Sequence, residues 1–297
     1  MWDRNLTDKT RRLIEAGDPE ERSKYVLEDC WIPYRPASEI SEELNFILER
    51  PRGNRPMGMA LIGESNNGKT EILKRFIQGH QTQRFDDRVN VRVLDIEAPP
   101  IPHLGHLYSK ILNRIGDPAA EKGTVGLRLE RLLILLDRLK VEILIVDEIH
   151  NVLTGSGKQK KAFLNMLKHI SNELKCPVVI AGTDKVQEVI GSDFQVQSRF
   201  PTFELPLWEP NEDLAKFLVR LEATLPLKNE SKLWNLTPDI YDLSGGVIGN
   251  VVKIIRRAAF DSIVSGEEQI TLKGLKRSAE KVTKPSGFAN TTSNQNP

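Results

Sequence analysis

"GESNNGKT", residues 63–70, follows the short apolar run MGMALIG and precedes KTEILKRFIQGH, which has helical spacing. The segment fits G-x-x-x-x-G-K-[ST] at each fixed position, which predicts a loop whose backbone N–H groups surround nucleotide phosphates. Glycine is needed where a side chain would obstruct the phosphates, and the following helix points its N-terminus at the anion. The alternative is a plain turn between a strand and a helix. The apolar strand before the motif and the helix after it favour the phosphate loop.

Individual residues of this loop have separate expected roles. We expect Lys69 to reach the β- and γ-phosphates and Thr70 to hold Mg²⁺ through its hydroxyl group. The predicted nucleotide-binding residues are Gly63, Glu64, Ser65, Asn66, Asn67, Gly68, Lys69, Thr70 and Glu71.

A pair of acids marks a second part of the predicted site. ILIVDEIH, residues 143–150, carries Asp147 and Glu148 at the end of a predicted buried strand, where open α/β sheets collect their catalytic groups. We expect Asp147 to complete the Mg²⁺ site and Glu148 to act as the general base on water. The alternative is that both acids only cap a strand in solvent. The phosphate loop upstream favours the catalytic interpretation.

Two further residues are candidates whose patterns leave alternatives open. Thr183 ends the strand-like segment VVIAGT, so it is placed to contact the γ-phosphate or the attacking water, but threonine is also a common turn residue. Arg199 precedes the last predicted strand. An arginine from a neighbouring subunit can stabilise charge in the transition state of phosphoryl transfer, and a surface salt bridge is the alternative.

Strand-like and helix-like segments alternate about five times, which predicts an α/β fold with a parallel sheet and helices on both faces. The expected strands are 57–63, 89–96, 141–148, 176–183 and 202–207. After Trp208 the pattern is helical only, and Asn211 is a suitable N-cap for the first of these helices. In the N-terminal segment we expect a helix at 10–16, then an irregular arm and a helix at 38–50 capped by Ser38. The expected domains are an N-terminal arm (1–45), a nucleotide-binding core (46–207), an all-α lid (208–283) and a disordered tail (284–297).

Composition limits the partners that the chain can attract. It has 297 residues with 42 Lys and Arg against 41 Asp and Glu, so any contact with nucleic acid or a membrane needs a local patch. Cys30 and Cys176 lie far apart in the sequence, which favours a reducing, cytoplasmic compartment. No apolar run approaches the roughly 18 residues of a membrane span, so we expect no membrane partner. The polar, acidic N-terminus is unlike a signal or transit peptide.

Three stretches together resemble the AAA+ ATPases, and most closely the ATP-dependent transposition regulators of the TniB and TnsC type, which are related to MuB. They are LIGESNNGKTEILKRF, the long segment from LIVDEIH to QVQSRF, and WEPNEDLAKFLVRLEATLPL. The resemblance runs from about Tyr34 to about Ile270. It implies a five-stranded core, a helical lid, ATP and Mg²⁺ as cofactors, and slow hydrolysis suited to a switch. It also makes Arg199 an arginine finger that acts on a neighbouring subunit and Thr183 the first sensor.

The resemblance also implies a set of partners. Members of this group assemble with ATP into a homo-oligomeric filament or ring on double-stranded DNA, and hydrolysis drives disassembly. They recruit a DDE transposase of the TniA or TnsB type and contact a TniQ-type target selector. Whether an RNA-guided complex chooses the target is left open. One departure is that Val252 stands where AAA+ lids often carry a second-sensor arginine, with Lys253 adjacent and Arg256 one turn later.

Two segments are candidates for contact with DNA phosphates. EKGTVGLR, residues 121–128, offers Lys122, Thr124 and the start of a helix, and GSGKQKK, residues 155–161, offers Lys158 in an expected flexible loop. The family resemblance favours the first. The alternative for such lysines is solubility. No base-reading motif is evident, so we expect little sequence preference.

Two rival functions remain open. An initiator-type AAA+ protein of the origin-recognition kind is expected to add a winged-helix domain after the lid, and the stretch after Ile270 is too short for one. A nucleotide-gated adaptor that does not hydrolyse ATP would not need Glu148.

Overall fold

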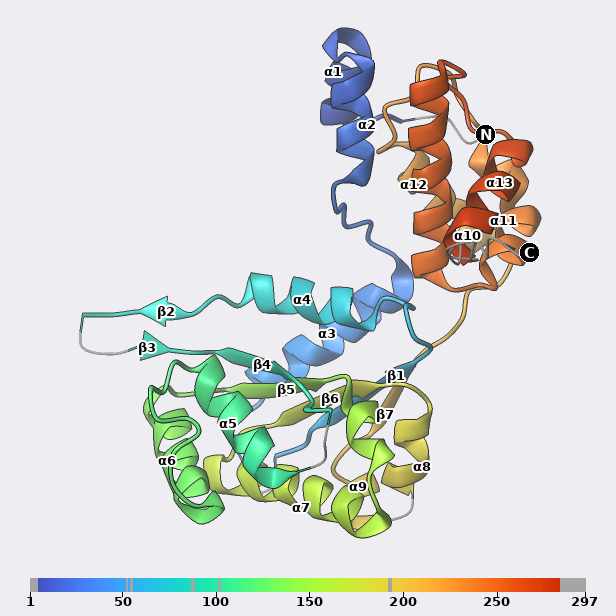
Figure 1. Cartoon of the computed structure of the whole chain (residues 1–297). Coiled ribbons are helices and arrows are strands. Elements are labelled where there is room, and N and C mark those ends of the chain that lie inside the picture. The colour runs from blue at the N-terminus through green and yellow to red at the C-terminus, as the bar shows by residue number, and fades with distance from the viewer. Residues whose placement is uncertain are drawn as a thin grey trace, which may run out of the picture. The chain divides into compact units, whose positions relative to one another are not determined.

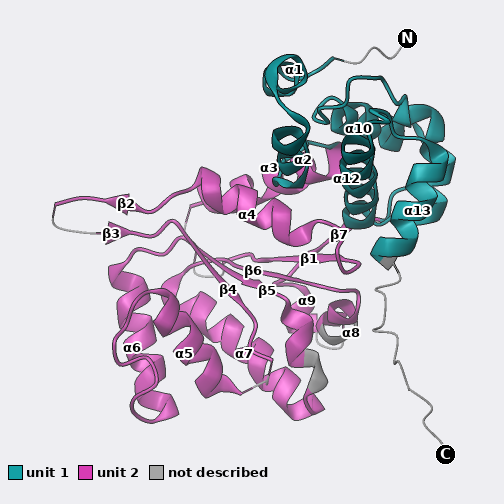
Figure 2. Cartoon of the chain, turned by 45° about the horizontal axis from the view of Figure 1, so that its top comes forward, with its two compact units in different colours: residues 1–34, 207–297 teal, residues 35–206 magenta. Residues whose placement is uncertain are grey.

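The computed structural model describes residues 5–51, 53, 56–86, 89–100, 103–191 and 194–283. The chain forms two compact units, shown in Figure 2. Unit 2 is Arg35–Pro206, and unit 1 combines Met1–Tyr34 with Leu207–Pro297. The expected N-terminal arm is therefore divided between the units after residue 34. The expected disordered tail, 284–297, lies outside the described residues.

Unit 2 is built on a parallel sheet with the strand order β4-β5-β6-β1-β7, which comprises five strands among the described residues. The strands are β1 (Met59–Gly63), β4 (Val93–Glu97), β5 (Ile143–Asp147), β6 (Val178–Gly182) and β7 (Thr202–Leu205). Every residue of β1 and β6 is buried, as expected for strands whose two faces are both covered.

Helices cover the two faces of this sheet, as Figure 1 shows. α3 and α4 lie on one face, and α5, α6 and α7 lie on the other. The helical elements of unit 2 are α3 (Arg35–Glu49), α4 (Lys69–Gly79), α5 (Leu104–Arg114), α6 (Val125–Arg138), η1 (Ile149–Thr154), α7 (Gly157–Leu174), α8 (Lys185–Gly191) and α9 (Phe194–Gln197). The predicted α/β class and the five-stranded parallel sheet are confirmed.

Several predicted boundaries in unit 2 are wrong. The expected strand at 89–96 is two elements, because β3 (Val89–Asn90) pairs antiparallel with β2 (Gln83–Arg84) in a hairpin and only β4 joins the main sheet. That hairpin extends from the end of α4 in Figure 1. α3 begins at Arg35, so Ser38 lies inside the helix and is not its N-cap.

Unit 1 is all helical in its described part, including the N-terminal segment. Its elements are α1 (Asp8–Ala16), α2 (Pro19–Leu27), α10 (Glu212–Glu222), η2 (Leu233–Leu236), α11 (Thr237–Ser244), α12 (Ile248–Ser265) and α13 (Leu272–Thr283). The predicted N-cap Asn211 is confirmed, since its side chain accepts from the N–H groups of Asp213 and Leu214. The expectation of an irregular arm is wrong for residues 19–27, which form α2.

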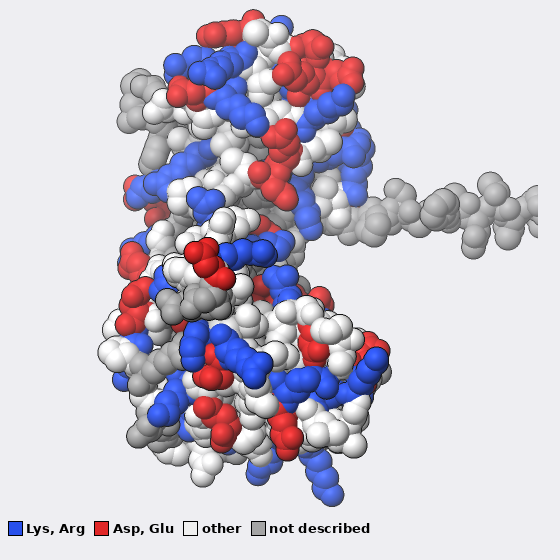
Figure 3. Space-filling model, turned by 90° about the vertical axis from the view of Figure 1, so that its left-hand side faces the viewer, with Lys and Arg blue, Asp and Glu red and all other residues white. Residues whose placement is uncertain are grey.

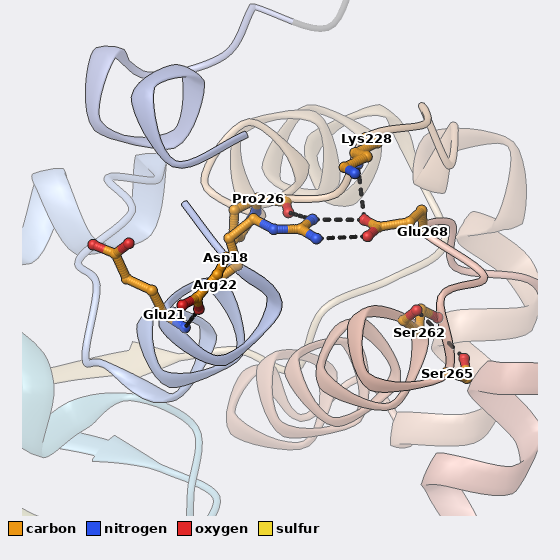
Figure 4. A network of polar contacts seen from close by, with 8 residues as sticks. All are labelled: Asp18, Glu21, Arg22, Pro226, Lys228, Ser262, Ser265 and Glu268. Carbon is orange, nitrogen blue, oxygen red and sulfur yellow. Dashed lines mark hydrogen bonds and ion pairs between the residues drawn. The ribbon is translucent and has the colours of Figure 1, made fainter. Parts of the chain in front are cut away.

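A buried ion pair fixes α2 within unit 1 (Figure 4). Arg22 is 1% exposed, and its guanidinium donates to both carboxylate oxygens of Glu268 at 2.7 and 2.6 Å. It also donates to the carbonyl oxygen of Pro226 at 3.0 Å. The guanidinium holds the pKa of Glu268 below its ordinary value of 4.5. α2 also packs along α12, so the N-terminal segment is an integral part of the helical unit.

None of the helices in the described ranges combines the length and the apolar character that crossing a membrane requires.

Candidate nucleotide-binding site

The phosphate loop connects β1 to α4. At its start, a Cβ atom on Gly63 would lie 2.8 Å from the carbonyl oxygen of Leu205, which leaves no room for a side chain. At its end, Gly68 has φ of 93°, a left-handed conformation that glycine adopts without strain, and it is the N-cap of α4. No side chain caps this helix, so its first N–H groups are available to an anion.

Lys69 is buried within the loop that it serves. Its side-chain nitrogen donates to the carbonyl oxygens of Gly63 and Glu64, at 2.8 Å each. Burial lowers the pKa of Lys69, and the nearby carboxylates of Glu148, Asp147 and Glu64 partly oppose this effect. An ammonium group has three donors, so the same nitrogen is able to donate to a phosphate oxygen as well.

Thr70 and Asp147 meet directly although 77 residues separate them. The Thr70 hydroxyl donates to Asp147 Oδ2 at 2.7 Å, and Asp147 Oδ1 accepts from the backbone N–H of Glu148 at 2.8 Å. This contact joins the start of α4 to the end of β5, even though β6 lies between β5 and β1 in the sheet. The structure thus brings the two predicted Mg²⁺ ligands together.

Glu148 follows Asp147 in a left-handed conformation, with φ of 55°, and its side chain is 36% exposed. The ring nitrogen His150 Nδ1 lies 3.1 Å from Glu148 Oε2, in an orientation that does not suit a hydrogen bond. A cavity of about 510 Å³ adjoins this carboxylate. Its lining includes Thr70, Leu73, Asp95, Asp147, Glu148 and Asn151.

Thr183 follows the end of β6, the strand between β1 and β5. It therefore lies at the same edge of the sheet as the phosphate loop and the acid pair. Its Oγ1 is buried and has no hydrogen-bond partner in the structure. A buried polar atom without a partner calls for an explanation, and a ligand group is one that fits this position.

Arg199 lies at the other edge of the sheet. Its carbonyl oxygen accepts from the N–H of Gly58, just before β1 begins, and its Nη1 donates to Asn172 Oδ1 at 2.6 Å. The structure does not bring Arg199 to the phosphate loop of its own chain. This separation follows from the direction of the strands, because Arg199 precedes β7, whose carboxyl end lies beside the phosphate loop.

The first candidate DNA segment is a structured turn before α6. Thr124 is the N-cap of α6, and its side chain accepts from the N–H of Leu127 at 3.3 Å. Arg131 braces the turn, because it pairs with Asp117 at 2.7 Å and donates to the carbonyl oxygen of Lys122 at 3.4 Å. The Lys122 side chain is exposed.

The second candidate segment is not the flexible loop that we expected. Lys158 lies in the first turn of α7, where Ser156 and Gln159 form a reciprocal capping box. The signal was present in the sequence as Ser156 with Gln159 three residues later. On the face drawn in Figure 3, Lys and Arg side chains are interspersed with Asp and Glu, in keeping with the net charge of +1.

In unit 1, Val252 occupies the position where a second-sensor arginine would stand, and Lys253 and Arg256 lie near it. Arg256 is largely buried and lies 3.8 Å from the Asp29 carboxylate, and Lys253 is exposed.

The residues present fit a nucleoside triphosphate with Mg²⁺. The loop offers backbone N–H groups and the Lys69 ammonium to phosphates, Thr70 and Asp147 supply the hard oxygen ligands that Mg²⁺ prefers, and Thr183 leaves a buried hydroxyl without a partner. Sequence reasoning missed one contact of the loop: the side chain of Asn67 donates to the carbonyl oxygens of Leu205 and Pro206. The phosphate-loop motif treats residue 67 only as a variable position.

The sheet order, the phosphate loop after β1 and the acid pair after β5 define a P-loop NTPase of the AAA+ class. A family model described as "Bacterial TniB protein" matches residues 22–210, more than half of the chain. The chain belongs to the TniB family and is a TniB-type AAA+ ATPase related to transposition.

Solved structures of similar fold include a Cdc6p protein and ORC proteins. Cdc6p from Pyrobaculum aerophilum is 17% identical, with a TM-score of 0.66 over 86% of this chain and 70% of that chain. The Aeropyrum pernix ORC2 protein is also 17% identical, with a TM-score of 0.66 over 87% and 71%. The A. pernix ORC1 protein, solved in complex with DNA, is 18% identical, with a TM-score of 0.60 over 88% and 69%. At these identities the likeness shows the fold alone. No curated protein matches the chain.

Proposed function

We propose that this protein is an ATP-dependent regulator of transposition that binds ATP and Mg²⁺ in the phosphate loop and assembles on double-stranded DNA with little sequence preference. The assembled filament or ring recruits a DDE transposase of the TniA or TnsB type and contacts a TniQ-type target selector. The hydrogen bond from Thr70 to Asp147 carries the nucleotide part of the proposal, because it brings the two expected metal ligands together from beyond β1 and from the end of β5. Membership of the TniB family supports the transposition part.

In this proposal each residue of the site has one task in hydrolysis. Mg²⁺, if held there, would supply positive charge that offsets the charge of the phosphates. Thr70 and Asp147 hold the metal, Lys69 binds the outer phosphates, and the Glu148 carboxylate accepts a proton from the attacking water. Thr183 positions that water or a γ-phosphate oxygen through the hydroxyl that has no protein partner. Slow turnover suits a switch whose hydrolysis releases the assembly.

The position of Arg199 supports assembly in this proposal. A finger at the far edge of the sheet can serve only the site of another copy, so a bound triphosphate would join adjacent protomers. Each protomer then adds a few phosphate contacts, through Lys122, Thr124 and Lys158, and the array multiplies them. This arrangement explains how a chain with a net charge of +1 would bind DNA.

Phosphate release by the Glu148→Gln variant tests whether the protein is a hydrolase or an adaptor that only binds nucleotide. We expect nucleotide binding to persist and hydrolysis to fall by roughly a hundredfold or more, as for loss of a general base. Glu142→Gln is the matched control. Glu142 immediately precedes the first residue of β5, at the end of the strand away from Glu148, and it pairs with Arg92. Equal, nucleotide-dependent phosphate release by parent and Glu148→Gln would contradict the assignment, and no release by the parent would favour the adaptor.

A further inference from the structure

The side chain of Asn67 ties the phosphate loop to the end of β7. Asn67 is 1% exposed, and its Nδ2 donates to two consecutive carbonyl oxygens, at 3.0 Å to Leu205 and 2.9 Å to Pro206. A primary amide has two N–H donors, so both are used on one short segment. The phosphate-loop pattern does not require asparagine at this position.

The sheet explains why this bond forms. Gly63 and Leu205 are register partners in the parallel pair of β1 and β7, so the loop leaves β1 beside the last residue of β7. β7 ends at Leu205, and Pro206 cannot continue it as a donor, so the carbonyl oxygens of these two residues are available to a side-chain donor. Asn67 supplies those donors from within the loop. Any shift of the loop backbone at Asn67 is thereby passed to residues 205 and 206.

The chain is fixed again two residues later, within unit 1. The Trp208 N–H donates to the carbonyl oxygen of Gly246 at 2.9 Å, and the Trp208 ring lies 5.2 Å from the rings of both Tyr34 and Phe217. Gly246 has φ of 72°, and a Cβ atom there would lie 2.4 Å from the Trp208 carbonyl oxygen. Leu207, which is 44% exposed, is the single residue between the fixed points.

We propose that Asn67 is a positioning residue that couples occupancy of the phosphate loop to the segment 205–208, and through it to the helical unit. This inference rests on the proposed binding of a nucleoside triphosphate by the loop. Phosphates that bind the loop N–H groups fix the loop backbone, and the Asn67 amide carries that constraint to the carbonyl groups of Leu205 and Pro206. Only Leu207 separates Pro206 from Trp208, so a restriction on the backbone of residue 206 also restricts the backbone at Trp208. A long flexible linker would not pass on such a restriction.

Hydrogen exchange with and without a non-hydrolysable ATP analogue tests the coupling in the full-length protein. In the parent we expect the analogue to slow exchange of peptides covering 207–212 by about threefold or more. Asn67→Leu keeps the approximate size of the side chain and removes both donors. At concentrations of the analogue that saturate the variant, as followed with a fluorescent ATP analogue, we expect it to lose most of the response at 207–212. Asn45→Leu is the matched control, because Asn45 is exposed and its Nδ2 donates to the carbonyl oxygen of Ser41 within α3, outside the phosphate loop.

A second variant covers the case in which Asn67→Leu disturbs the loop itself. One glycine inserted between Pro206 and Leu207 leaves the hydrogen bonds of Asn67 intact and makes the segment between Pro206 and Trp208 longer and more flexible. We expect nucleotide binding as in the parent and a reduced response at 207–212. A parental response in Asn67→Leu or in the insertion variant overturns the coupling. Failure of the parent to bind the analogue would instead overturn the proposed function.

Discussion

Thr183 illustrates, at the scale of a single residue, how a site can be recognised by what it leaves unsatisfied. Its Oγ1 is buried at the edge of the sheet that carries the predicted catalytic groups, and it has no hydrogen-bond partner among the residues that the structure describes. A buried hydroxyl of this kind contributes nothing to the stability of the folded chain and costs desolvation. A role with a bound ligand explains it, whereas a turn residue in solvent would not be buried.

Thr183→Val separates these two explanations. We expect the free energy of unfolding to stay the same or rise by up to about 1 kcal/mol, because valine replaces a hydroxyl that has no partner. We expect phosphate release to fall by roughly tenfold or more, as for loss of one hydrogen bond to a charged group. Denaturant unfolding and steady-state hydrolysis measure the two effects. A destabilised variant with unchanged hydrolysis would make Thr183 a purely structural residue.

The residues of the site were predictable to different degrees. Lys69, Thr70, Asp147 and Glu148 stand in patterns with fixed spacing, and the structure brings them together as those patterns require. Asn67 was included only as part of the loop, because its role depends on a partner 138 residues away in sequence. Long-range contacts of this kind follow from strand register, which the pattern of a single strand does not specify.

At the scale of elements, the pair formed by Arg22 and Glu268 decides whether α2 stays packed in the helical unit. Removing one member of a buried pair leaves the other charge uncompensated, so we expect Arg22→Met to cost about 3–5 kcal/mol in unfolding free energy. Arg22→Met combined with Glu268→Gln removes both charges and should recover much of that loss. Lys24→Met, on the same helix in an exposed pair with Glu20, should leave stability unchanged.

The same pair predicts a dependence of stability on pH. The pKa of Glu268 is lowered from 4.5 in the folded protein, so its contribution is fully present above pH 4.5 and is lost as the pH falls through the lower folded value. Denaturant unfolding should therefore show a steeper acid loss in the parent than in the double variant. Parallel curves for the two proteins would show that the pair does not contribute in this way.

Some elements with strong local signals were predicted well, and others were missed despite such signals. β1, β5 and β6 are apolar runs with turn signals, and each is a buried strand. α2 was missed although Asp18, Pro19 and two acids in the first turn form a recognisable helix start. α5 was missed as well, although its apolar residues have helical spacing. The segment at 89–96 alternates like one strand, but only tertiary pairing shows that its first residues join a separate hairpin.

At the scale of the whole molecule, one compact unit is built from two segments that lie at opposite ends of the sequence. Residues 1–34 belong with those after 207, so the nucleotide-binding unit is an insertion within the helical one. The chain passes between the units at 34–35 and at 206–207, and the rings of Tyr34 and Trp208 beside these crossings contact each other within unit 1 in a tilted arrangement. No local pattern in the sequence could reveal this pairing, because it depends on contacts between the two ends of the chain.

DNA binding belongs to this scale, because we expect it from the assembled array and not from one protomer. Lys122→Glu reverses a charge in the turn before α6 without touching the phosphate loop. We expect weaker binding to duplex DNA in the presence of ATP and unchanged binding of ATP by the free protein. Fluorescence anisotropy with a labelled duplex measures the first, and an affinity equal to the parent's would exclude Lys122 from the DNA contact.

The central claim is that a triphosphate held by Lys69, Thr70 and Asp147 joins protomers, and that only the joined array binds duplex DNA well. Electron microscopy of the protein with duplex DNA, with and without ATP, tests it most directly, using the parent and Lys69→Ala. The account predicts filaments or rings for the parent only when ATP is present, and none for Lys69→Ala. Equal coating of the DNA by Lys69→Ala without nucleotide would contradict it.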